Sequence, residues 1–481
     1  MKKSAGILSV VVVLGVAYAA TTWYVGKRAQ ATIEQAVEQA NQRLVTVLGP
    51  DLGGRGLKVA ISEYKRHVFS SDVVYTLQLK DSNGKPVEYL LSDHLQHGPF
   101  PVSAVKSGNL SPLLVLSHAQ LIPSAVTQKW FDSLKGESPV VATTQVGFSG
   151  AGHSQWQFKP LDITEDGDTL QFSGGSVAMT FSNDFKNSTA AGQFDSFAYA
   201  MAASGEKLQV KGIKLDSAST TSDDTNVNVK SSASVENLVV SSSDAETLQI
   251  DAMAVSLDSE QKGKLVQGAL RYDFGRLLVG QADLGSISVG AKGSDFDVDA
   301  LTALAVEYDQ INAAHGGASD ADIQLTGKEA ASLREKMAAV LATNPKVSID
   351  PVVWKNDKGE STLALTVNLS GAGLAADSGA QFDLLLPKLI KLLSLDVSIS
   401  KPMFVKAFGQ VQEGAQASQQ TLMIGTMIFD QYVNRLASAG LAKVDGDKAA
   451  TSIKYENDSV DVNGKKMSVA ELVQRGLSVV M

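Results

Sequence analysis

The residues best suited to metal chemistry in this sequence lie in one short string. His94 and His97 are three residues apart, and Gly98, Pro99, Phe100 and Pro101 follow directly. Metal binding would need both imidazoles on one helical face together with a third ligand. Gly98 and Pro99 indicate a loop instead, and no Asp/His cluster at ligand spacing follows. We therefore predict no metal-binding residues here.

We interpret His97–Pro101 as a structural or interaction loop. Each proline fixes its own φ near −65° and restricts the residue before it, so the string is nearly rigid. Such stiffness would present Phe100 at a fixed angle, either into the core or toward a partner. We expect Phe100 to fill the core and His97 to bond to the backbone.

The sequence contains only part of the motif that is typical of serine hydrolases. The string Gly147-Phe148-Ser149-Gly150-Ala151 lacks the last glycine of a nucleophile elbow. An uncharacterised hydrolase would have to pair Ser149 with His153 or His118 as its base. Gly371-Ala372-Gly373 lacks the third glycine of a dinucleotide loop. We predict no catalytic residues, no cofactor-binding residues and no cofactor.

Composition excludes several classes of protein. The 481 residues contain no cysteine, which rules out thiol catalysis, iron–sulfur clusters and disulfides. The chain has 42 Lys+Arg and 51 Asp+Glu, for a formal net charge of −9, and only 6% of its residues are aromatic. A nucleic-acid binder needs clustered positive charge and stacking platforms, so we expect no nucleic-acid partner.

The first 28 residues predict the cellular compartment. Lys2 and Lys3 precede an uncharged stretch that Lys27 and Arg28 close. Residues 5–25 would span about 31 Å as a helix, close to the roughly 30 Å hydrocarbon core. We favour an uncleaved, single-pass inner-membrane anchor with the bulk of the chain in the periplasm. The alternative is a signal peptide cleaved after Ala17-Tyr18-Ala19.

The remaining sequence predicts an α+β chain. We expect a stalk helix and linker over residues 29–56, a β-rich region over 57–300 and a mixed α/β region over 301–481. Residues 165–300 alternate apolar and polar residues between Ser, Asp, Gly and Thr clusters, which is typical of a large antiparallel meander with one apolar face. Helices are predicted mainly in the last third, over 300–314, 328–342, 384–393 and, as one long helix, 403–439.

Several separate strings give the chain a resemblance to a known family. They are Val68-Phe69-Ser70-Ser71, His97-Gly98-Pro99-Phe100-Pro101, Lys135-Gly136-Glu137-Ser138-Pro139, Phe172-Ser173-Gly174-Gly175, Trp354-Lys355-Asn356 and Val462-Asn463-Gly464-Lys465-Lys466. In order and spacing the chain resembles the YdgA family of bacterial envelope proteins, whose biochemical activity is unassigned. The resemblance implies a protein that is tethered to the inner membrane or periplasmic, and it implies no catalytic residues.

Two roles without catalysis remain open. The first is an envelope scaffold acting as a homo-oligomer or with an envelope protein partner, favoured by the small residues of the predicted 403–439 helix. The second is a carrier of lipid or another apolar ligand, which would need the 165–300 sheet to leave its apolar face accessible. In either role the bilayer is contacted through residues 5–25.

Overall fold

The computed structural model describes residue 41 and residues 57–480, apart from 68–69, 82–84, 98–99, 183–185, 224, 316–324 and 372–388. The chain divides into two compact units, residues 1–223 and 224–481. The predicted anchor at 5–25 and nearly all of the predicted stalk lie outside the described residues. Among the helices that are described, none is both long and apolar enough to cross a membrane.

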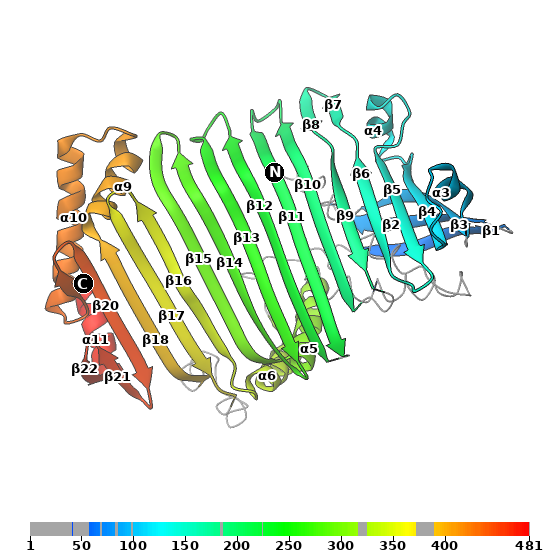
Figure 1. The fold of residues 1–481 in the computed structure, drawn as a ribbon. Helices are drawn as coiled ribbons and strands as arrows, with labels where there is room; N and C mark the ends of the chain where they lie inside the picture. The colour runs from blue at the N-terminus through cyan, green and yellow to red at the C-terminus, as the bar shows by residue number, and fades with distance from the viewer. Residues whose placement is uncertain are drawn as a thin grey trace. The chain divides into compact units, whose positions relative to one another are not determined.

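Unit 1 (residues 1–223) is an antiparallel sheet in which the strands from β1 to β6 pair in chain order, and β9, β10 and β11 do the same (Figure 1). The β6–β7 and β8–β9 segments form one bent hairpin, because β6 pairs with β9 and β7 with β8. Its elements are β1 (Lys58–Arg66), β2 (Ser70–Lys80), β3 (Pro86–His97), α3 (Val102–Lys106), β4 (Leu113–Ile122), α4 (Gln128–Ser133), β5 (Val140–Gly147), β6 (Gly152–Phe158), β7 (Leu161–Glu165), β8 (Asp168–Phe172), β9 (Gly175–Phe181), β10 (Asn187–Ala200) and β11 (Lys207–Asp223).

The core of unit 1 lies on one face of this sheet. It draws buried side chains from β1 to β6, from β9 and from β10, and Phe131 of α4 belongs to it. Trp130 of α4 stacks on Tyr89, with ring centroids 6.0 Å apart. The strand alternation therefore produces a fully covered apolar face here.

Unit 2 (residues 224–481) is an antiparallel meander, interrupted by helices (Figure 1). Its elements are β12 (Asn226–Ser241), β13 (Leu248–Lys262), β14 (Leu265–Val279), β15 (Ala282–Asp297), α5 (Val298–Ala314), α6 (Gly327–Leu341), β16 (Lys346–Asn356), β17 (Gly359–Leu369), β18 (Ile390–Ser400), α9 (Lys401–Glu413), α10 (Gln419–Ser438), β19 (Lys443–Asp445), β20 (Lys448–Glu456), β21 (Ser459–Val462), β22 (Lys465–Ser468) and α11 (Val469–Val480).

The fold bears out the large antiparallel sheet and several of the C-terminal helices. The predicted helices over 300–314 and 328–342 are α5 and α6. The predicted boundary at residue 300 lies within unit 2, between β15 and β16, which pair with each other across the two helices. Asn463 and Gly464 both have positive φ, as a two-residue hairpin turn of type I′ requires.

Two helix predictions are wrong. Residues 384–388 of the helix predicted over 384–393 lie outside the described residues, and residues 390–393 belong to strand β18, where Leu393 and Leu395 pair between β17 and β20. Tertiary pairing overrides local propensity there. The single helix predicted over 403–439 is two helices, α9 and α10, separated at Gly414. Gly414 has φ +76°, a conformation that glycine adopts readily and that ends a helix.

Candidate functional site

The predicted loop His97–Pro101 lies at one end of unit 1, and Gly98 and Pro99 are outside the described residues. The side chain of Phe100 is 54% exposed, so its interpretation as a core residue is wrong. The physical reason is the helix that follows. Pro101 is the buried N-cap of α3, and Ala104 packs with Leu113 and Leu116 over the end of the sheet. This arrangement turns Phe100 outward.

His97 bonds to a serine side chain and not to the backbone partner that we expected. Its Nε2 lies 3.1 Å from Oγ of Ser71, which also accepts a hydrogen bond from the Tyr64 hydroxyl. Burial lowers the pKa of His97, with a smaller effect from Arg66, which favours the neutral imidazole. The pairing of His97 with Ser71 could not be predicted from the sequence, because 26 residues separate the two and only the β2–β3 register brings them together.

A neutral histidine beside a serine is the nucleophile–base arrangement of hydrolases. Ser71, however, is fully buried, so no external substrate can reach its hydroxyl. Ser149, which the hydrolase alternative would need as its nucleophile, lies in the β5–β6 turn, where its Oγ accepts a hydrogen bond from the backbone N–H of Ala151. His118 lies on β4, with Nδ1 3.5 Å from Oγ1 of Thr143. His153, the other base named for this alternative, lies on β6. Among the described residues, neither His118 nor His153 forms a hydrogen bond with Ser149.

Asp93 is a carboxylic acid buried in the core face of unit 1. It is 2% exposed, and Ser117 Oγ donates a hydrogen bond of 2.7 Å to its Oδ1. Burial raises the pKa of Asp93 to about 6, and the bond from Ser117 offsets part of that rise. A second polar pair, Thr144 and Ser154, lies on the same face with oxygens 2.7 Å apart. Asp93 is a neutral hydrogen-bonding group at mildly acidic pH.

The outer face of the same strands carries a histidine pair. Asp72 lies between His94, at 2.6 Å from Nδ1, and His67, at 2.9 Å from Nε2. The bonds from His94 and then His67 hold the pKa of Asp72 below its usual value. Both histidines are about half exposed, as is Asp72. Throughout the described part of the chain, no group of three His, Asp or Glu side chains has the arrangement of a metal site.

Unit 2 presents a different feature, a continuous apolar face. Pairing from β13 through β20 lines up one apolar residue from each strand: Leu257, Leu270, Ala291, Ile349, Leu365, Leu395 and Ile453. A second row next to it contains Ala233, Val255, Tyr272, Val289, Val352, Leu363 and Val397. We call these two rows the apolar face of unit 2.

No residue of the apolar face is fully buried. Leu257 is 42% exposed and Tyr272 36%, and the other members are half-buried. Among the described helices, the contacts with this face lie mainly at its ends. At one end Leu341 of α6 packs near Leu369, and at the other Asn356 donates a hydrogen bond to the Met403 carbonyl of α9. The rows between these ends are the candidate functional site of the chain.

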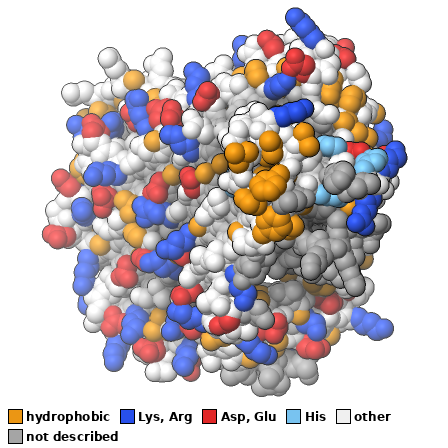
Figure 2. Space-filling view, turned by 45° about the vertical axis from the view of Figure 1, so that its right-hand side comes forward, with side chains coloured by type: hydrophobic (Ala, Val, Ile, Leu, Met, Phe, Trp, Pro, Cys, Tyr) orange, Lys and Arg blue, Asp and Glu red, His pale blue; other side chains and the backbone are white. Residues whose placement is uncertain are grey.

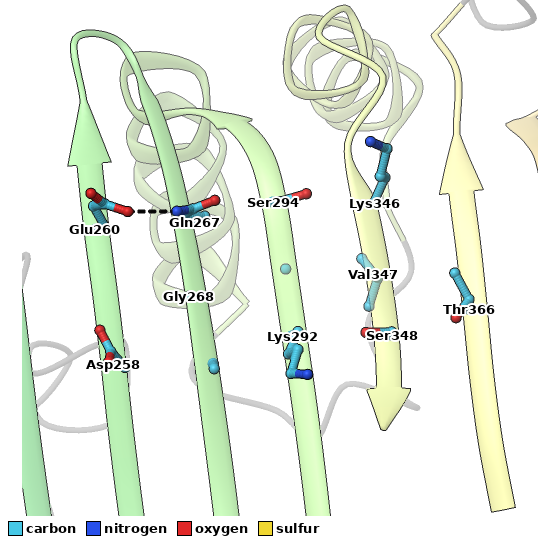
Figure 3. Close-up of a pocket in the computed structure, with 12 residues that line it drawn as sticks. Asp258, Glu260, Gln267, Gly268, Lys292, Ser294, Lys346, Val347, Ser348 and Thr366 are labelled. Carbon is cyan, nitrogen blue, oxygen red and sulfur yellow. Dashed lines mark hydrogen bonds between the residues drawn. The ribbon is translucent and has the colours of Figure 1, made fainter. Parts of the chain in front are cut away.

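The opposite face of the same strands is polar. Figure 3 shows a groove there, with Asp258 and Glu260 of β13 facing Lys292 of β15 and Lys346 of β16. These charges already have partners nearby: Lys292 lies 2.6 Å from Asp350, and Gln267 donates to Glu260 at 2.6 Å. We interpret the groove as a solvated sheet face, because paired and exposed charges need no ligand.

The small residues of the predicted 403–439 helix are used inside unit 2. A Cβ at Gly409 would lie 2.8 Å from Leu422, and one at Gly425 would lie 2.8 Å from the Phe408 ring. These glycines let α9 and α10 approach each other. Three larger apolar residues of α10, Met423, Met427 and Tyr432, are each more than 60% exposed, and Met423 and Met427 lie on the same side of the helix.

Comparison with known proteins gives relatives along the whole chain. The chain is 27% identical to Protein YdgA of Escherichia coli (strain K12) over 98% of its own length and 96% of the relative's. It is 23% identical to the uncharacterized protein YihF of the same organism, over 99% and 98% of the two chains. An uncharacterized Haemophilus influenzae protein is 25% identical over 37% of this chain and 48% of its own.

The family resemblance that the sequence strings indicated is thereby confirmed. The family model described as "Bacterial protein of unknown function (DUF945)" matches residues 1–470. The chain belongs to the DUF945 family of bacterial proteins.

Proposed function

We propose that this protein is a non-enzymatic carrier of an apolar ligand of the acyl-chain class, which binds along the apolar face of unit 2. The observation that supports the proposal is the half-exposure of two aligned apolar rows in a folded unit. Soluble domains rarely leave large contiguous apolar surface in water unless it binds something.

The size of the face suits an extended hydrocarbon ligand. The first row crosses seven strands, or about 29 Å at roughly 4.8 Å per strand. That length is comparable with the roughly 30 Å hydrocarbon thickness of a bilayer. The rows contain aliphatic side chains and one tyrosine but no charged residue, so they offer contacts to methylene groups and none to an ionic headgroup.

The cellular setting that we propose is the bacterial inner membrane. Residues 5–25 would anchor the chain, with residues 29–481 in the periplasm, and the apolar sequence of that stretch supports this placement. Mass analysis of the N-terminus of the purified protein tests it. A mature protein that begins at Ala20 would contradict the anchor.

Photocrosslinking in living cells tests the carrier. A benzophenone amino acid in place of Leu365 would point from the apolar face, and the same residue in place of Thr366 would point from the polar face of the same strand. After irradiation we expect adducts of lipid mass on the intact protein at position 365 and few at position 366. Equal lipid labelling at both positions, or none at either, would overturn the proposal.

A second candidate function is a scaffold that acts as a homo-oligomer. The exposure of Met423, Met427 and Tyr432 on α10 supports it, since Met and Tyr are favoured at contact surfaces. Analytical ultracentrifugation of the full chain should give a doubled mass that Met427→Glu reduces to that of one chain. Gln474→Glu, at an exposed polar position of α11, serves as the control. A single-chain mass for the unaltered protein would contradict this candidate.

A further inference from the structure

One end of unit 1 collects three chain connections. The register places the β1–β2, β3–β4 and β5–β6 connections at the same end, since Ser70 pairs with Gln96, His97 with Val115 and Val146 with Gly152. We call the described residues of the β3–β4 and β5–β6 connections, 100–112 and 148–151, the tip of unit 1.

The tip exposes large apolar side chains. They are Phe100 at 54%, Val102 at 63%, Val105 at 42%, Leu110 at 69% and Phe148 at 58%. Figure 2 shows hydrophobic side chains gathered beside the histidines on the side of the molecule that it draws. An apolar group of this kind on a folded unit indicates an interaction surface.

The charge of the tip differs from that of the rest of the chain. Residues 100–112 and 148–151 contain no carboxylate, and their one charged residue is Lys106. The opposite end of the same strands carries six charged residues in the β2–β3 and β4–β5 connections, Asp81, Lys85, Lys129, Asp132, Lys135 and Glu137. In a chain of net charge −9, the tip is locally apolar and basic.

We propose that the tip of unit 1 inserts into the surface of a lipid bilayer. Aromatic and aliphatic side chains partition into the boundary between headgroups and acyl chains, and a basic residue beside them is attracted to anionic headgroups. Lys106 has no ion-pair partner among the described residues, so it is available for a headgroup. The negative charge elsewhere on the chain opposes other orientations on an anionic surface.

A bilayer fits these observations better than a second copy of the chain. Protein interfaces carry a polar rim with matched hydrogen bonds and charges. Two copies of this tip would bring lysine against lysine with no carboxylate to receive either. Asn41 is hydrogen-bonded to Val59 near the start of β1, which leaves residues 26–40 between that point and the membrane that residues 5–25 are expected to enter. Fifteen residues cover about 50 Å when fully extended, which is more than the roughly 25 Å from Val59 along β1 to the tip. This inference does not rest on the proposed carrier function.

The absence of cysteine permits a site-specific test. Leu110→Cys and, at the opposite end, Lys135→Cys each give the full chain one thiol for an environment-sensitive fluorophore. The labelled proteins are reconstituted into vesicles of phosphatidylethanolamine and phosphatidylglycerol that contain spin-labelled lipid. We expect a blue-shifted emission and a several-fold stronger quenching at position 110 than at position 135.

Two further outcomes decide against the bilayer. Equal and weak quenching at both positions would overturn the proposal. A blue shift at position 110 without quenching by the spin-labelled lipid would identify a protein contact instead, such as a second copy, and would also overturn it. In the Leu110→Cys protein, the added substitutions Phe100→Ser and Val102→Ser should reduce the quenching. Both positions are exposed, so these variants should fold.

Discussion

The strands of both units alternate apolar and polar residues, but the apolar face is buried in unit 1 and partly exposed in unit 2. In unit 1 the cross-strand row Val73, Asp93, Ala119, Ala142 and Trp156 is at most 5% exposed. In unit 2 the row that runs from Leu257 to Ile453 contains no buried residue. Alternation therefore determines which side chains share a face of the sheet, whereas other parts of the fold determine whether that face is covered.

The difference has an energetic consequence. Full burial of a leucine or valine side chain contributes roughly 1.5–3 kcal/mol, and half-burial contributes correspondingly less. The core of unit 1 gains the contribution of full burial from strands β1 to β6, β9 and β10 and from Phe131 of α4. The apolar face of unit 2 leaves part of the same contribution unrealised until something covers it, which is why a ligand there would stabilise the unit.

The strongest test of the comparison is one substitution made in both units. Leu121 in unit 1 is 1% exposed, and Leu365 lies in the half-buried row of unit 2. Leu121→Ala should lower the free energy of unfolding of unit 1 by about 2–5 kcal/mol, because it leaves a cavity. Leu365→Ala should cost unit 2 roughly 1 kcal/mol. Hydrogen exchange of peptides from each unit measures both values. Equal losses of unfolding free energy in the two variants would contradict the difference in burial between the two faces.

The buried acid of unit 1 gives a pH-dependent effect that the apolar face of unit 2 has no group to reproduce. Because the pKa of Asp93 is raised to about 6 in the folded chain, the folded state holds more protons than the unfolded state between about pH 4 and 6. Asp93 therefore lowers stability as the pH rises through that window. The gain from Asp93→Asn should be larger at pH 7 than at pH 4 by up to about 3 kcal/mol.

Denaturant unfolding of both proteins across this pH range measures the effect. Leu91→Met, a volume-conserving change at a buried neighbour, should shift stability without any dependence on pH. If the difference between Asp93→Asn and the unaltered chain stayed constant from pH 4 to 7, the acid would not be buried in the manner described.

A smaller effect is expected at the helices that cover one end of the apolar face. Thr326 caps α6 with a capping box in which Glu329 bonds back to the cap. Thr326→Ala should cost about 1 kcal/mol in the stability of unit 2, since one orphan N–H loses its acceptor. Glu335→Ala on the exposed side of the same helix is the control and should stay near zero. Chemical denaturation monitored at Trp354 reports on this unit.

The smallest effect is expected at the tip of unit 1. Phe100→Ala should change the free energy of unfolding by less than about 0.5 kcal/mol, because more than half of the ring is already exposed to water. The melting temperature should therefore change very little. Phe131→Ala, the same change at a ring that is 4% exposed, should cost about 3–5 kcal/mol. A clear destabilisation by Phe100→Ala would return this ring to a structural role and weaken the case for a surface that contacts lipid.

The alternation of apolar and polar residues was enough, without coordinates, to predict an antiparallel sheet, and the apolar periodicity of 300–314 and 328–342 was enough to predict α5 and α6. These are local patterns, and a prediction from a local pattern is correct where the local preference agrees with the tertiary fold. The family was also readable from strings spread along the chain. Where local apolarity was ambiguous, as in the run that enters β18, the sequence favoured the wrong element.

Only the tertiary structure decided the arrangement of the candidate sites. The bond between Ser71 and His97, the burial of Asp93 and the outward position of Phe100 depend on strand register and on α3, which no short string encodes. The same holds for the contrast between the two faces. Whether a row such as Ile349, Leu365 and Leu395 is covered depends on where distant helices pack, and that is a property of the assembled unit.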